Sequence, residues 1–167
     1  MNKMWVLLLP AAILSLGLSG CGPKTENVGA ENVEAVVENL FEDLEESDYE
    51  ELTGKEGEGT PASTELPDWV QDRFQGYMTE GGYETLTGTA FYEISVKAFE
   101  NHKSMDLENL EVQEKEGDYE IKGDLTIAAE GEETSIEIQG SAQTDQKGLV
   151  SYLDLSNISE IAETLQS

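Results

Sequence analysis

Apolar residues recur at helical spacing in the segment that follows residue 30. They stand three or four positions apart while glutamates fill the opposite side, which is the pattern of an amphipathic helix. The apolar face of this predicted helix consists of Val33, Val36, Val37, Leu40, Phe41 and Leu44. Ser47 and Glu50 then have the spacing of a capping box, which predicts a second short helix that runs through Leu52.

Two further helical signals follow a predicted loop. The segment from Thr53 to Glu65 contains glycines and a proline but no apolar period, so we expect it to be exposed. Pro67 suits the first turn of a third helix, because a missing N–H costs nothing there. One face of that helix would carry Val70, Phe74, Tyr77 and Met78. Thr79 has the chemistry of an N-cap and predicts a short helix that contains Leu86.

The stretch 91–99 fits two periods. Its apolar residues alternate as they would in a strand, but a second set of positions has helical spacing, so periodicity alone leaves both structures open. Ile94 and Val96 are β-branched and prefer a pleated surface, which favours a strand.

Period-two alternation predicts four strands after that stretch. The alternating positions are Leu110 and Val112, then Tyr119, Ile121, Leu125 and Ile127, then Ile136, Ile138 and Ala142, and finally residues 149–155. Turn residues at 116–118 and at Gly131 separate these groups, which indicates an antiparallel meander. Gly123 and Gly140 lie inside strands and permit a bend or a bulge, so we expect a curved sheet. Ile158, Ile161, Ala162 and Leu165 indicate a closing helical turn with Ser156 as the candidate cap, and a frayed terminus is the alternative that the pattern leaves open.

Helices first and a meander second define an α+β domain, with N-terminal helices packed on a curved antiparallel meander sheet. The order of a long helix, a short helix at Asp48 to Leu52, a third helix at Trp69 to Met78 and a bent sheet resembles the nuclear-transport-factor-2-like (NTF2-like) fold over residues 31–155. The resemblance implies a cone whose mouth often holds a small ligand. Some members are isomerases or dehydratases with an Asp/His or Asp/Tyr pair in the cone. No such pair can be matched to positions in this chain.

The first twenty residues differ from all that follow. Lys3 precedes the uncharged apolar run 5–18, which is the layout of an export signal and is shorter than the roughly 20 residues of a bilayer span. The run ends in Leu18-Ser19-Gly20-Cys21, which resembles the bacterial lipobox. That resemblance implies cleavage after Gly20 and a diacylglycerol group on the Cys21 thiol. We therefore expect a signal peptide at 1–20, the lipidated cysteine and a tether at 21–30, and one α+β domain at 31–167.

The net charge of the chain excludes one class of binding partner. It carries 36 acidic and 9 basic residues, a formal net charge of -27, and this field repels phosphate backbones. We therefore expect no nucleic acid partner. The expected partners are the membrane, through the lipid anchor, and an unknown small molecule or envelope protein on the extracytoplasmic side.

No combination of residues indicates catalytic, metal or cofactor chemistry. His102 is the only histidine and stands in a polar turn without a visible partner. The acidic runs 42–46 and 130–133 lack the ligand spacing of an EF-hand loop. Glycines 54, 57 and 59 lie among glutamates that would repel phosphate. We expect no catalytic residues, no metal and no cofactor, and we favour a protein that is not an enzyme.

The candidate pocket residues are aromatic. Trp69, Phe74, Tyr77 and Tyr119 would line a ligand cone, but large aromatics at helical spacing also form core faces, and core packing is the more frequent role. The leading hypothesis is a membrane-tethered, non-enzymatic small-ligand-binding or protein-interaction domain. The alternative is an isomerase or hydrolase-type enzyme that uses a carboxylate buried in the cone. A third hypothesis is a structural accessory of an envelope complex.

The substitution Cys21→Ala tests the anchor. We expect the domain to fold but to be left unprocessed or released from the membrane, because the lipid would be its main membrane-seeking feature. Membrane fractionation and gel mobility measure the two effects. Unchanged membrane retention of the variant would contradict the lipoprotein hypothesis.

Overall fold

The computed structural model describes residues 27–53, 66–89 and 91–167. The residues of the predicted lipobox, Leu18 to Cys21, lie outside these ranges, and so does the predicted loop after Thr53. None of the helices in the described ranges is long and apolar enough to cross a membrane. The elements, in chain order, are α1 (Val28–Leu40), α2 (Glu46–Thr53), α3 (Asp68–Phe74), α4 (Glu80–Gly88), α5 (Glu93–Glu100), β1 (Ser104–Lys115), β2 (Asp118–Ala129), β3 (Glu132–Thr144), β4 (Val150–Leu155) and α6 (Ile158–Gln166).

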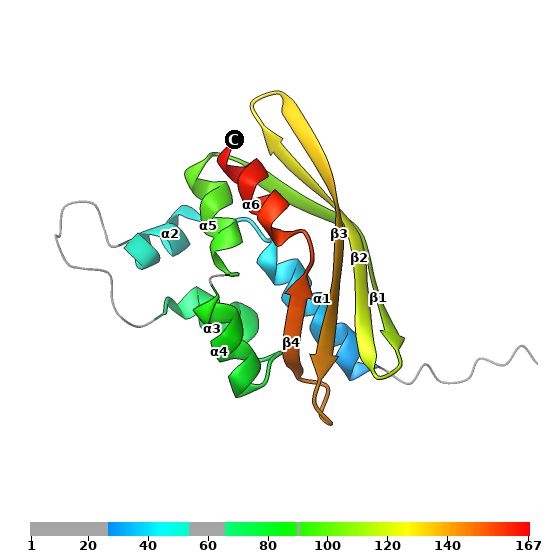
Figure 1. Cartoon of the computed structure of the whole chain (residues 1–167). Coiled ribbons are helices and arrows are strands. Elements are labelled where there is room, and N and C mark those ends of the chain that lie inside the picture. Colours follow the sequence, from blue (N-terminus) through cyan, green and yellow to red (C-terminus); the bar gives the residue numbers. More distant parts are fainter. Residues whose placement is uncertain (1–26, 54–65, 90) are drawn as a thin grey trace, which may run out of the picture.

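The four strands form one antiparallel meander in the order β1-β2-β3-β4, so the α+β class and the predicted strand order are confirmed. The helices gather on one side of the sheet (Figure 1). Each alternating residue predicted for β2 and β3 is buried, while the residues between them are mostly exposed. The turn between β1 and β2 consists of Glu116 and Gly117, with φ of 57° and 95°, which suits a tight hairpin.

The predicted curvature has a local cause at Gly123. Residues 109–110 of β1 stand opposite this single residue of β2, which is a β-bulge. Asn109 has φ of 52°, and its side chain is one of the few that tolerate this conformation. Gly140 has a different role, because a Cβ there would collide with the backbone carbonyl of Asp154 in β4. The glycine therefore lets β3 and β4 approach closely.

Helix α1 lies against the inner face of the sheet and forms the centre of the core. Its side chains pack in one cluster with inner-face residues of the strands, and those with 0 % exposure are Val33, Val36, Val37 and Leu40. Asn27 is the N-cap, and its side chain accepts a hydrogen bond from the Ala30 N–H at 3.2 Å. The helix thus begins within residues 21–30, the segment predicted as a tether, and the packed domain starts earlier than residue 31.

The stretch 91–99 is a correction to the sequence analysis, because residues 93–100 form helix α5 and not a strand. Ile94 and Ala98 are buried one helical turn apart, and α5 packs against α6. Ser95, which is also buried, donates to the Tyr92 carbonyl. Lys97 and Glu93 form an ion pair at 3.0 Å across one turn. Tertiary packing of the helical face overrides the strand preference of the β-branched residues.

Three element ends also differ from the predictions. Helix α2 begins at Glu46, so Ser47 lies inside it and is not its cap. Helix α3 ends at Phe74, and Met78 lies beyond it in a parallel bridge to Val150. The N-cap of α6 is Asn157 and not Ser156. Met78 pairs with Val150 and Asn157 donates to the Glu137 carbonyl, and local spacing reveals neither contact.

Two neighbouring glycines of α4 allow a matched test of this packing. A Cβ on Gly82 would lie 2.5 Å from the Val150 carbonyl oxygen, whereas a Cβ on Gly81 would meet nothing within 4 Å. We expect Gly82→Ala to lower the free energy of unfolding by about 1–3 kcal/mol, because α4 must move off β4. Gly81→Ala is expected to raise it by up to about 1 kcal/mol through helix propensity. Urea unfolding of both variants measures the difference, and equal effects would contradict the close approach.

Candidate binding site

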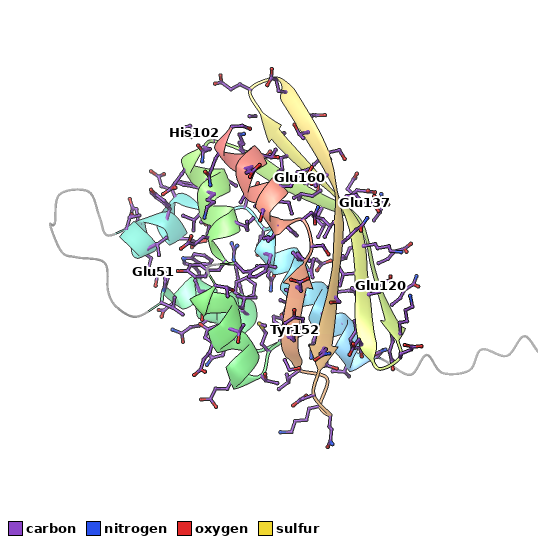
Figure 2. All side chains as sticks on the ribbon, in the orientation of Figure 1. Glu51, His102, Glu120, Glu137, Tyr152 and Glu160 are labelled. Carbon is purple, nitrogen blue, oxygen red and sulfur yellow. The ribbon has the colours of Figure 1, made fainter. Side chains whose placement is uncertain are left out.

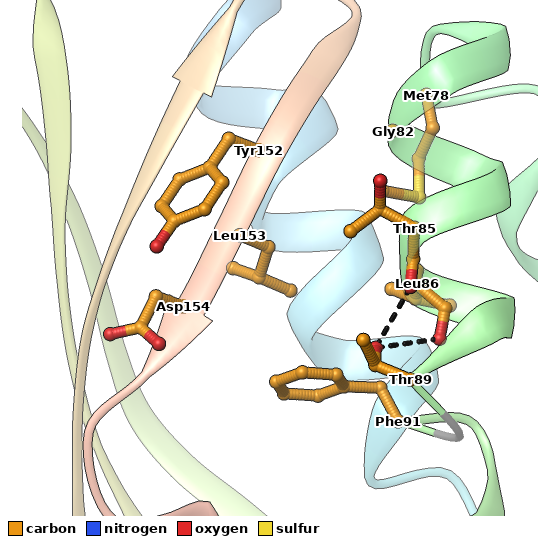
Figure 3. A pocket seen from close by; sticks show the side chains of 9 residues that line it. All are labelled: Met78, Gly82, Thr85, Leu86, Thr89, Phe91, Tyr152, Leu153 and Asp154. Atoms are coloured by element: carbon orange, nitrogen blue, oxygen red, sulfur yellow. Dashed lines mark hydrogen bonds between the residues drawn. The ribbon is translucent and has the colours of Figure 1, made fainter.

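A pocket of about 200 Å³ lies between helix α4 and the edge strand β4 (Figure 3). The helix provides one wall, the residues just before and after it close two sides, and the outer edge of β4 provides the opposite wall. The lining residues are Met78, Gly82, Thr85, Leu86, Thr89, Phe91, Tyr152, Leu153 and Asp154.

Backbone contacts hold α4 beside β4. The Val150 N–H donates to the Tyr77 carbonyl and the Thr79 N–H donates to the Val150 carbonyl, both at 2.9 Å. Thr79 is also the N-cap of α4, as predicted, and its hydroxyl accepts a hydrogen bond from the Gly82 N–H at 3.1 Å. The start of the helix is therefore fixed to the start of the strand, and Gly82 allows the two backbones to meet.

The interior of the pocket is apolar. The side chain of Leu153 points toward α4, while those of Tyr152 and Asp154 point away from it (Figure 3). The hydroxyl groups of Thr85 and Thr89 each donate at 2.8 Å to carbonyl oxygens of α4, so they are engaged within the helix. A group that enters the pocket would therefore be held mainly by its removal from water.

The four aromatic residues predicted to line a cone belong to the core. Trp69, Phe74 and Tyr119 are buried, and Tyr77 is partly buried against the same cluster. None of them is among the residues that line the α4–β4 pocket. Phe74 ends α3 beside the C-terminal half of α1, whereas Tyr119 donates to the side chain of Asn27, the N-cap of α1. The structure therefore does not bring the four together at one site.

Within this core, Trp69 contacts a charged and an aromatic side chain. The Arg73 guanidinium lies 5.1 Å from the Trp69 ring centroid, and the Tyr92 ring approaches Trp69 edge-on at 6.1 Å. Burial raises the pKa of Tyr83 and of Tyr92, with charge repulsion from Tyr92 and Glu93 respectively adding to it. Trp69 Nε1 and the Tyr83 hydroxyl are buried without a hydrogen-bond partner in the described part of the chain. Both tyrosines stay neutral at physiological pH.

Residues with hydrolytic or metal chemistry do not gather in the described ranges. Ser95 is the only polar or charged residue there that is buried, so every described carboxylate retains contact with water. No group of three or more histidine, cysteine, aspartate or glutamate side chains among the described residues could hold a metal ion. His102 is exposed, with φ of 54°, in the turn that follows α5.

Carboxylates cluster on the outer face of the sheet. Glu137 and Glu120 point away from the helices (Figure 2). Glu108 pairs with Asp124 across β1 and β2, and Asp124 pairs with Glu137 across β2 and β3, so three exposed carboxylates lie side by side. Like charges that face each other on neighbouring strands destabilise a sheet. This row of three carboxylates therefore lowers the stability of the sheet.

Sequence reasoning missed the α4–β4 pocket. The sequence predicts the helix that contains Leu86 and the strand that contains Leu153, but no spacing indicates that these two residues face each other. Comparisons add no further information on the site, because no protein-family model, curated protein or solved structure shows a significant match to this chain.

The row of carboxylates yields a stability prediction with an internal control. We expect Glu137→Gln to raise the free energy of unfolding by about 0.2–1 kcal/mol at low salt, because it removes a like-charge contact. The control is Glu111→Gln, on the same face but opposite Lys122, which should be neutral or destabilising. Added salt should shrink both effects. A loss of stability for Glu137→Gln at low salt would contradict the electrostatic interpretation.

Proposed function

We propose that this chain is an extracytoplasmic lipoprotein, anchored to a membrane by lipidated Cys21, whose domain binds a partner without transforming it. The observation that carries the proposal is the apolar pocket between α4 and β4. Among the described residues no histidine or cysteine lines it, and the side chain of Asp154 points away from α4 (Figure 3). Such walls exclude water from an apolar group and present no general acid or base to it.

The enzymatic alternative requires a carboxylate that is removed from water. No Asp or Glu among the described residues is buried, so none of them meets this requirement. Binding of a small apolar ligand or of a protein segment therefore has more support than an isomerase or hydrolase reaction.

The anchor would hold the domain close to the membrane. Residues 22–27 separate Cys21 from the first helix and can span at most about 20 Å when fully extended. Asn27 accepts a hydrogen bond from the Tyr119 hydroxyl at 2.9 Å and donates one to Glu114 at 3.0 Å. These contacts fix the position from which the tether would leave the domain, so a partner would be met near the membrane surface.

We further propose that the domain is a variant of the NTF2-like fold. Its support is the order of helices α1 to α3 before a curved antiparallel sheet, with the helices on one side of that sheet. The resemblance implies a ligand at the mouth of the cone, and in this chain α1 covers the inner face of the sheet. The pocket at the edge of β4 would take over the binding role.

A pocket-filling variant tests this function. N-acetyl-leucinamide, a water-soluble neutral probe with one apolar side chain, should show saturation transfer from the full processed chain in phosphatidylcholine nanodiscs. Thr85→Trp should abolish the signal, because the indole would occupy the pocket that Thr85 lines. Glu84→Trp, on the same helix but outside the lining, should retain it.

Two outcomes of this experiment would count against the proposal. A signal that is equal in Thr85→Trp and in the natural chain would place the binding elsewhere. The absence of any signal from the natural chain, with the fold verified by circular dichroism, would remove the α4–β4 pocket as a binding site.

A further inference from the structure

The outer edge of β4 is only partly covered. Among the described residues, the segment around Met78 forms the neighbour of β4 on the side away from β3, through a parallel bridge to Val150. Both backbone groups of Val150 are satisfied there, by Tyr77 and Thr79. The chain then enters α4, so this pairing ends after one bridge. The edge beyond Val150 faces the pocket.

After Val150, the next pocket-lining residue of β4 whose backbone N–H and C=O point toward the outer edge is Leu153. The Ser156 N–H donates to the Gln139 carbonyl of β3 at 2.9 Å. Alternation along an antiparallel ladder then makes Leu155 and Leu153 members of non-hydrogen-bonded pairs with β3. The N–H and C=O of Leu153 therefore point away from β3, beside the pocket that its side chain also lines.

We propose that an extended peptide segment of a partner protein adds to the sheet beside β4, bonded to the backbone of Leu153, with one apolar side chain in the α4–β4 pocket. This inference rests on the proposed binding function and names its ligand. The pocket, about 200 Å³, is smaller than the roughly 300–1,000 Å³ that encloses a whole small molecule. Strand addition needs less, because main-chain bonds give affinity and a pocket selects one side chain.

Charge selects among possible peptides. Helix α4 and strand β4 carry Glu80, Glu84 and Asp154 and contain no lysine or arginine. The chain as a whole has a formal net charge of -27. Lysine or arginine on both sides of the apolar residue would therefore speed association, whereas a second copy of this chain would be repelled.

A pair of probe peptides tests strand addition directly. The first is dye-labelled Lys-Thr-Val-Leu-Val-Thr-Lys, and the second is the same peptide with its three central amides N-methylated. Fluorescence anisotropy with the full processed chain in phosphatidylcholine nanodiscs measures affinity, and empty nanodiscs give the background. Each lost backbone hydrogen bond should weaken binding roughly two- to tenfold, so the methylated peptide should bind more weakly. A third peptide with glutamate at both ends should also bind more weakly, and salt should reduce that difference.

Two substitutions at residue 153 distinguish the contribution of the backbone N–H to peptide binding from that of the Leu153 side chain. Leu153→Ala removes most of the side chain but keeps the N–H, whereas Leu153→Pro also removes the N–H. Proline is tolerated at an edge strand where the N–H does not bond to the ladder, so both variants should fold, which circular dichroism checks. We expect Leu153→Pro to bind the unmethylated peptide roughly two- to tenfold more weakly than Leu153→Ala does.

The outcomes separate this inference from the function on which it rests. Equal affinity for the methylated and unmethylated peptides overturns strand addition. Strand addition is also overturned if the protein alone forms a concentration-dependent dimer in which a second copy covers the β4 edge. If the peptides then fail while N-acetyl-leucinamide still binds, the pocket function stands without strand addition. If neither probe binds, both proposals fall. Because the peptide pair needs no change to the protein, a variant that does not fold leaves this comparison intact.

Discussion

The burial of helix α1 against the inner face of the sheet is the constraint on which the rest of the fold depends. Four of its apolar side chains have no exposure, and burying side chains of this size contributes about 1.5–3 kcal/mol each. Their sum is comparable with the whole stability of a typical domain, roughly 5–15 kcal/mol. The chain has one cysteine and therefore no internal disulfide to compensate for a loss in this core. Because α1 covers the inner face of the sheet, the α4–β4 pocket lies beside the edge strand and not over that face.

The central strands β2 and β3 could be predicted from the sequence because each has one buried face. A period of two then leaves a clear record, and turn glycines at 117 and 131 mark the ends of the hairpins. For residues 91–99 the favoured strand was wrong and the helix that the pattern also allowed is formed, because helix α5 packs against α6 and this overrides the local β preference. The end of α3 was misplaced for a related reason, since Met78 pairs with a strand that lies far along the chain.

The site was less predictable than the fold. Aromatic residues with helical spacing, such as Trp69 and Phe74, are in this domain part of the core, and sequence pattern alone does not separate a core face from a pocket wall. The pocket depends instead on which helix packs at the edge of the sheet. That choice follows from Thr79, which caps α4 and bonds to Val150, and from Gly82, which allows the close approach. Only the capping role of Thr79 is visible without the tertiary structure.

The acidic surface and the open edge of β4 are physically connected. An edge strand with free backbone groups invites pairing with another chain, and proteins usually limit this with charge, short length or cover. Here β4 is short, Met78 and α4 cover its start, and the carboxylates around it repel identical chains, which would meet at high local concentration if a membrane holds them. The same field does not oppose a cationic segment. A charge that costs stability on the outer face of the sheet can thus protect an edge from self-association and still leave it open to a partner of opposite charge.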